Sequence, residues 1–236
     1  MIEGGNCVAW IGSGLSKDAG YPSWFEAVEK LCLNCGLQEL GIFNEEPAEK
    51  LMEKAENCKS TSLDKYQGTL ARLYGREVTT TRHAFYLLMK LPFRGYITTN
   101  FDPLLSTAGA TFGYDLYSYP DLPLMELRGN RHPIYYIHGL ALRDGKPRGD
   151  NLVFSRSEFK AAYEDSDILR SFLVQLLTYC SIFFIGCSLA EKPIHQVFQR
   201  VHRIHTQIQS ETPEARLPQR YKQDSLKDIY FSKIAQ

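Results

Sequence analysis

Short apolar runs alternate with longer amphipathic segments along the chain. Four runs, each followed by small or polar residues, are typical of buried strands, at residues 7–11, 95–97, 134–137 and 182–185. Their apolar character is continuous rather than alternating, as in parallel strands covered on both faces. Three segments have the spacing of amphipathic helices, at residues 23–33, 82–91 and 167–179. The pattern predicts an α/β protein with a Rossmann-like, mostly parallel sheet and helices on both faces.

Two regions depart from this alternation. Residues 35–80 are rich in Glu, Lys, Asn and Ser and contain no convincing strand pattern, which indicates a helical insert. From Arg200 onward the apolar periodicity weakens. We therefore expect one domain over residues 1–205 that includes the insert, followed at 206–236 by a polar tail or the start of a further segment.

Composition and charge exclude several classes of protein. Lys and Arg together number 27, as do Asp and Glu, and this neutral balance argues against a general nucleic-acid-binding surface. No window approaches the roughly 18 to 20 apolar residues of a membrane span, and the first residues do not resemble a signal peptide. The six cysteines fit a reducing compartment. We expect a cytoplasmic protein that neither spans a membrane nor binds nucleic acid.

A glycine-rich turn follows the first predicted strand. It contains Gly12, Ser13, Gly14 and Ser16, at a place where backbone amides are able to approach a phosphate closely. Lys17 occupies the position of the third glycine in the dinucleotide fingerprint of oxidoreductases, so a dehydrogenase fits poorly. The local chemistry leaves a phosphate site and a plain tight turn as alternatives.

Polar residues follow the second predicted strand. Asn100 and Asp102 come directly after it, and ligands of open α/β sheets bind beyond the carboxyl ends of the strands. The Asn100 amide is able to donate to and accept from ribose hydroxyls or water. For Asp102 the alternative is a cap on a helix that begins at Pro103.

A histidine and a glycine follow the third predicted strand. His138 is able to exchange protons near neutral pH, and we expect Gly139 to leave room for a ligand beside the ring. A structural role for a single histidine at a strand end is the alternative.

Small residues follow the fourth predicted strand. Gly186 and Ser188 offer an amide and a hydroxyl to a phosphate or ribose, whereas we interpret Cys187 as a buried structural residue. Cys32 and Cys35 form a CxxC motif without a second pair at zinc-finger spacing, so we interpret them as core or interface positions.

Together the four turns resemble the sirtuin superfamily, and especially the zinc-free sirtuin-like NAD hydrolase domains of bacterial antiphage defence proteins. The resemblance covers residues 8–199. It is carried by GSGLSKDAGYPSW at 12–24, TTNFD at 98–102, His-Gly at 138–139 and GCSL at 186–189. The order of these motifs agrees with the family.

The resemblance implies a site for NAD as substrate and a role for each matching residue. Asn100 would orient the ribose and the attacking water, Asp102 would hold the nicotinamide carboxamide, and His138 would act as general base. The residues implied to contact NAD are Gly12, Ser13, Gly14, Ser16, Thr99, Gly186 and Ser188. Thr99 stands where the family has a glutamine.

One departure from the deacylase sirtuins bears on the reaction. Those enzymes carry two CxxC pairs after the His-Gly that bind a structural zinc, and this chain has none there, so we expect no zinc. The expected function is therefore NAD glycohydrolysis by a regulated, NAD-depleting defence effector. The alternatives are NAD-dependent protein deacylation and a non-catalytic module that binds NAD or ADP-ribose. A homo-oligomer or an activating partner or sensor domain is the expected source of regulation.

Overall fold

The protein is described from a computed structural model, which covers residues 6–37, 46–76, 82–123, 132–187 and 198–199. Five strands form one sheet in the order β3-β4-β2-β1-β7, and every neighbouring pair is parallel. The strands are β1 (Cys7–Ile11), β2 (Gly95–Thr98), β3 (Leu116–Ser118), β4 (Ile134–Tyr136) and β7 (Ser181–Ile185). The Rossmann-like α/β fold predicted from the sequence is confirmed.

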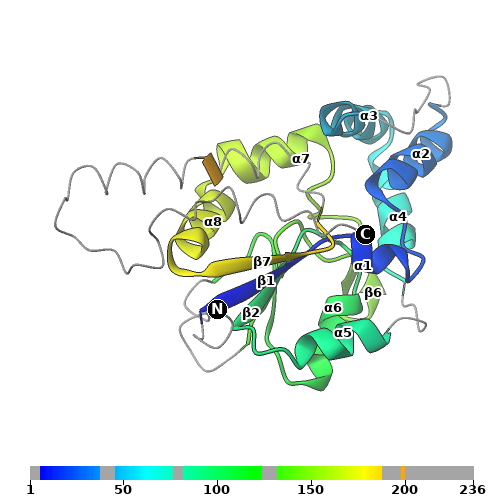
Figure 1. The fold of residues 1–236 in the computed structure, drawn as a ribbon. Helices are drawn as coiled ribbons and strands as arrows, with labels where there is room; N and C mark the ends of the chain where they lie inside the picture. The colour runs from blue at the N-terminus through cyan, green and yellow to red at the C-terminus, as the bar shows by residue number, and fades with distance from the viewer. Residues whose placement is uncertain (1–5, 38–45, 77–81, 124–131, 188–197, 200–236) are drawn as a thin grey trace, which may run out of the picture.

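Strand β1 lies between β2 and β7 and is buried along its whole length. Its side chains alternate between two hydrophobic cores, with Ala9 and Ile11 in one and Val8 and Trp10 in the other. Helices α5 (Arg82–Met89) and α6 (Leu104–Thr111) cover the first face of the sheet, and α8 (Asp167–Tyr179) covers the second (Figure 1). This two-faced burial explains the continuous apolar character of β1.

Strand β7 differs from the prediction of a fully buried strand. Its residues are only partly buried, and Phe183 is 46% exposed. The reason is its place in the sheet, because β7 is an edge strand that pairs with β1 alone among the described strands.

The region predicted as a helical insert contains α3 (Ala48–Thr61) and α4 (Leu63–Tyr74), which both pack on α2 (Trp24–Cys35). Ser23 starts α2 with a capping box: its side chain accepts from the Glu26 amide, and the Glu26 carboxylate accepts from the Ser23 amide. Cys32 and Cys35 are buried in the core of these helices, as predicted, and the Cys32 sulfur lies 3.6 Å from that of Cys58.

Several short elements were not predicted. They are β3, the hairpin of β5 (Leu142–Arg143) and β6 (Lys146–Pro147), helices α1 (Gly14–Lys17) and α7 (Arg156–Lys160), and the π-helix η4 (Ala161–Asp165). The hairpin has a recognisable signal, since Asp144 and Gly145 both adopt positive φ angles, which Asp-Gly favours in tight turns.

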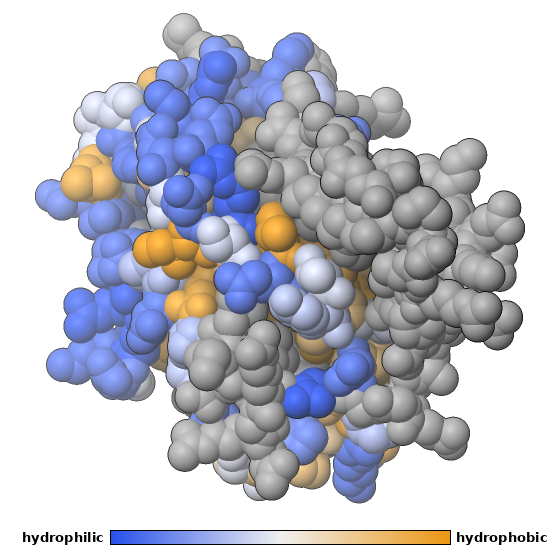
Figure 2. All heavy atoms as spheres, turned by 90° about the vertical axis from the view of Figure 1, so that its left-hand side faces the viewer, coloured by the Kyte–Doolittle hydropathy of each residue, from blue (hydrophilic) through white to orange (hydrophobic). Residues whose placement is uncertain are grey.

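Figure 2 shows the side of the molecule from which β1 begins. Among the described residues on this face, hydrophobic ones gather near the centre and most of the others are hydrophilic. None of the described helices is long and apolar enough to cross a membrane. The predicted tail at 206–236 lies outside the described residues, so the domain boundary at 205 stays a prediction.

Candidate active site

A pocket lies where β1, β2 and β4 end. It has about 530 Å³ of space between atoms, part of it open to solvent. Strand β1 is also the point where the sheet order reverses, since β2 lies on one side of it and β7 on the other. Six residues predicted from the sequence line this pocket: Ser13, Ser16, Thr99, Asn100, Asp102 and His138.

Asn100 is fixed by three hydrogen bonds. Its Nδ2 donates to the Gly12 carbonyl at 3.1 Å and to Ser16 Oγ at 3.0 Å, and its backbone amide donates to Thr98 Oγ1 at 3.0 Å. The Gly12 carbonyl only accepts, which fixes the orientation of the amide. Because both Nδ2 hydrogens are used within the protein, the Asn100 group that remains for a ligand is the acceptor Oδ1.

Asp102 is a buried carboxyl beside Asn100, with 3% of its surface exposed. Its Oδ1 accepts from the amide of Leu104, the first residue of α6, at 3.1 Å, and the Ser16 hydroxyl also bonds to it. Burial raises its pKa to about 6 because desolvation outweighs these hydrogen bonds. The two alternatives from the sequence therefore coexist, since Asp102 caps the start of α6 and also lines the pocket.

His138 is a buried ring with 2% of its surface exposed. Its Nε2 lies 2.7 Å from the hydroxyl of Tyr163, and burial lowers its pKa to about 3, so the imidazole is neutral at pH 7. Sequence reasoning missed Tyr163, because nothing in the residues around it marks a partner 25 positions from the histidine.

Gly139 does not leave room for a ligand, so that expectation is wrong. Its φ is +95°, and a Cβ at this position would lie 2.4 Å from the carbonyl oxygen of Asn151. The glycine is required by its backbone conformation and by the close approach of a neighbouring loop.

The glycine-rich turn packs against the end of β7. The Gly12 amide donates to the Ile185 carbonyl at 2.8 Å, and the Gly14 amide donates to the Gly186 carbonyl at 3.0 Å. A Cβ at Gly12 would lie 2.3 Å from the Gly186 oxygen. Gly12 and Gly14 therefore connect the ends of β1 and β7, and their amides are already hydrogen-bonded within the protein. A phosphate-binding role for the turn stays a prediction.

Ser188, the last residue predicted to contact NAD, lies outside the described residues. Cys187 is partly rather than fully buried, and its sulfur contacts the carbonyls of Trp10 at 3.3 Å and Ile185 at 3.5 Å. Within the described part of the chain, no group of three or more His, Cys, Asp or Glu residues is placed to hold a metal ion.

Aromatic side chains form most of the remaining pocket wall, and the sequence did not single them out for this role. Trp24, Tyr74, Phe101 and Phe159 line it, and Phe154 packs behind Trp24 and Phe101 with ring centroids 6.0 and 5.7 Å away. Among the described residues, the indole Nε1 of Trp24 is buried and meets no hydrogen-bond acceptor. It is an unused donor on a residue of the pocket.

The sequence was also compared with known families and proteins. A family model described as a SIR2-like domain matches residues 94–228, more than half of the chain. The chain belongs to the SIR2-like domain family. The match includes the turns that carry Asn100, Asp102 and His138, and membership points to an NAD-related function. Comparison with curated proteins gave no match.

Proposed function

We propose that this SIR2-like protein cleaves NAD to nicotinamide and ADP-ribose, and that it acts in the cytoplasm as a regulated, NAD-depleting defence effector. The observation that carries the proposal is the pocket in which Asn100, Asp102 and His138 meet at adjoining strand ends. In the reaction, water adds to C1′ of the ribose while the C–N bond to nicotinamide breaks. The bonding pair returns to the nicotinamide nitrogen, which leaves neutral and needs no acid.

The hydrogen bonds of the pocket support a distinct role for each side chain. Oδ1 of Asn100, the free acceptor, would bind a hydrogen of the attacking water or of a ribose hydroxyl. The neutral imidazole of His138 would take the proton released by the water. The Asp102 carboxylate would accept from the carboxamide N–H of nicotinamide. The Trp24 indole adds a donor.

Two further observations favour hydrolysis over transfer of an acyl group. In the deacylase sirtuins a zinc module follows the His-Gly, whereas here that place is taken by the short β5–β6 hairpin. The only cysteines that follow His138 in the sequence are Cys180 and Cys187, so the two CxxC pairs of that module are missing. In deacylase sirtuins the groove for the acyl-peptide lies beside this module, so the lack of the module disfavours deacylation.

The test is to incubate the full chain with NAD over a range of protein concentrations and to quantify nicotinamide and ADP-ribose by chromatography. We expect equal amounts of the two products. His138→Ala and Asn100→Ala should each lower turnover about 100-fold, the scale of a lost proton-transfer or positioning group. Asn34→Ala is the matched control, because Asn34 is exposed on α2 and bonds to Thr69 outside the pocket.

Two other outcomes contradict the proposal, and a third bears on its regulation. Nicotinamide release that requires an acetylated peptide, and consumes it in equal amount, would establish deacylation. NAD binding without turnover at any protein concentration would establish a binding module. A steep dependence of specific activity on concentration would support a homo-oligomer as the active form.

A further inference from the structure

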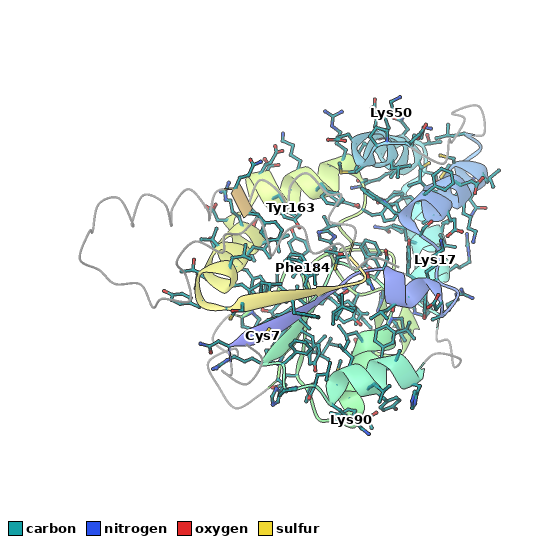
Figure 3. All side chains as sticks on the ribbon, viewed as in Figure 1. Cys7, Lys17, Lys50, Lys90, Tyr163 and Phe184 are labelled. Carbon is teal, nitrogen blue, oxygen red and sulfur yellow. The ribbon has the colours of Figure 1, made fainter. Side chains whose placement is uncertain are left out.

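Tyr163 contacts His138 but is not one of the residues that line the pocket. The hydroxyl and Nε2 are 2.7 Å apart, and both residues are buried, with exposed fractions of 6% and 2%. His138 lines the pocket, whereas Tyr163 does not. Figure 3 shows Tyr163 in the layer between the α7–α8 segment and the sheet. A buried tyrosine thus backs the ring that faces the pocket.

The position of Tyr163 is fixed by the π-helix η4, which directly follows α7. The Tyr163 ring stacks on Phe159 with centroids 5.9 Å apart and planes 11° apart, and Phe159 meets the edge of His138 at 5.1 Å. Single turns of π-helix inside α-helical segments are frequent at functional sites, because the wider turn changes the direction of a side chain. Here the π-helix carries the hydroxyl that contacts the imidazole.

The start of this segment is anchored to the helical insert. Glu158 accepts hydrogen bonds from the amides of Phe154 and Ser155, at 3.1 and 2.8 Å, and from the Tyr66 hydroxyl on α4 at 2.7 Å. Lys59 on α3 adds an ion pair to Glu158 at 3.0 Å. Tyr163 is therefore carried by a segment with several points of attachment, as a group that orients another side chain must be.

The chemistry of the contact decides which nitrogen of His138 is available to the pocket. A neutral imidazole has one nitrogen that donates and one that accepts, and a tyrosine hydroxyl is able to do either. Since Nε2 is held by Tyr163, a proton taken from the pocket side has to go to Nδ1. For Nδ1 to accept, Nε2 must carry the hydrogen and donate it to the Tyr163 oxygen.

We propose that Tyr163 is a positioning residue for the His138 base: its oxygen accepts the Nε2 hydrogen and leaves Nδ1 to take the proton of the attacking water. This inference rests on the proposed NAD cleavage. One water proton moves to Nδ1, the water oxygen bonds to C1′, and the electron pair of the broken C–N bond stays with nicotinamide. The imidazolium keeps a partner for Nε2–H in a buried site, where an unpaired N–H is costly.

Tyr163→Phe tests the proposal, because it keeps the ring that stacks on Phe159 and removes only the hydroxyl. Tyr179→Phe is the control, since Tyr179 is 60% exposed at the end of α8. In the ¹⁵N-labelled protein, the ring-nitrogen NMR signals of His138 are identified by their loss in His138→Ala. We expect the wild type to show hydrogen on Nε2 and not on Nδ1, and Tyr163→Phe to lose this preference. The kcat for NAD should fall about 10-fold while KM changes little.

The outcomes separate this proposal from the proposed function. Hydrogen on Nδ1 in the wild type, or unchanged ring signals and kcat in Tyr163→Phe, would overturn the positioning role even where NAD cleavage depends on His138. A third result is that the wild type does not cleave NAD while the His138 ring signals still differ between the wild type and Tyr163→Phe. The hydrogen bond would then be supported, and both the NAD cleavage and the role of His138 as its base would be contradicted. Equal loss of kcat in Tyr179→Phe would also overturn the proposal.

Discussion

The two sides of the pocket are built in different ways. The polar side consists of Asn100, Asp102 and His138, which follow strand ends, and Ser16 of the short helix α1. It is fixed by directional hydrogen bonds with distances of 2.7 to 3.1 Å. The aromatic side comes mostly from helices and is fixed by ring packing; Trp24, Tyr74, Phe101 and Phe159 line it, and Phe154 packs behind them. Hydrogen bonds set which atom faces a ligand, whereas packing sets only the shape that surrounds it. Changes on the polar side should therefore act on chemistry, and changes on the aromatic side on stability and affinity.

The largest effect on stability is expected for Phe154→Ala. Phe154 is fully buried and contacts the rings of Trp24, Tyr74 and Phe101, so its loss leaves a cavity at the centre of the aromatic side. We expect the free energy of unfolding, measured by urea denaturation, to fall by about 3 to 5 kcal/mol. Phe112→Ala is the control, because Phe112 is 37% exposed. A similar loss of free energy of unfolding in Phe112→Ala would contradict a dominant contribution of Phe154 to stability.

A smaller effect, with the opposite sign, is expected for Asp102→Asn on the polar side. The pKa of Asp102 rises from 3.8 in the unfolded chain to about 6 in the folded protein, so its ionisation destabilises the fold as the pH rises through this range. The free energy of unfolding of Asp102→Asn, relative to the wild type, should therefore increase between pH 4 and pH 7 by up to about 3 kcal/mol. His138 titrates in both proteins and cancels in the difference. If the difference in the free energy of unfolding between Asp102→Asn and the wild type does not change with pH, the raised pKa of Asp102 is contradicted.

The smallest effect is expected for Trp24→Phe, which tests whether one aromatic residue also acts on the polar chemistry. Phenylalanine keeps a ring near Phe154 and Phe159 but removes the buried indole donor. If that N–H donates to NAD, KM should rise about 3- to 10-fold, the value of one hydrogen bond, with kcat nearly constant. Unchanged KM in a variant of wild-type stability would leave Trp24 with a packing role alone.

The sequence predicted the strand ends well because short motifs mark them. Thr99, Asn100 and His138 each follow an apolar run, and parallel strands bring their carboxyl ends to one edge of the sheet. Residues that depend on tertiary packing were missed. Tyr163 and Phe159 lie in a segment that includes a π-helix, which no local sequence pattern marks. The need for glycine at position 139 comes from the close approach of the Asn151 carbonyl, which no sequence pattern reveals. The sequence thus identified chemistry that is local to a motif and not the groups that orient it.

The strand order also determines when the site comes into being during synthesis. Strand β1 leaves the ribosome before the other described strands, and both of its neighbours follow much later, since Asn100 bonds to a residue 88 positions earlier and Cys187 to one 177 positions earlier. Such long-range pairings form slowly because a long loop has to close for each of them. An incomplete chain that lacks β7 has no partner for the amides of Gly12 and Gly14, and one that ends before residue 138 lacks the histidine altogether. Completion of the pocket is thereby tied to the late, long-range steps of folding.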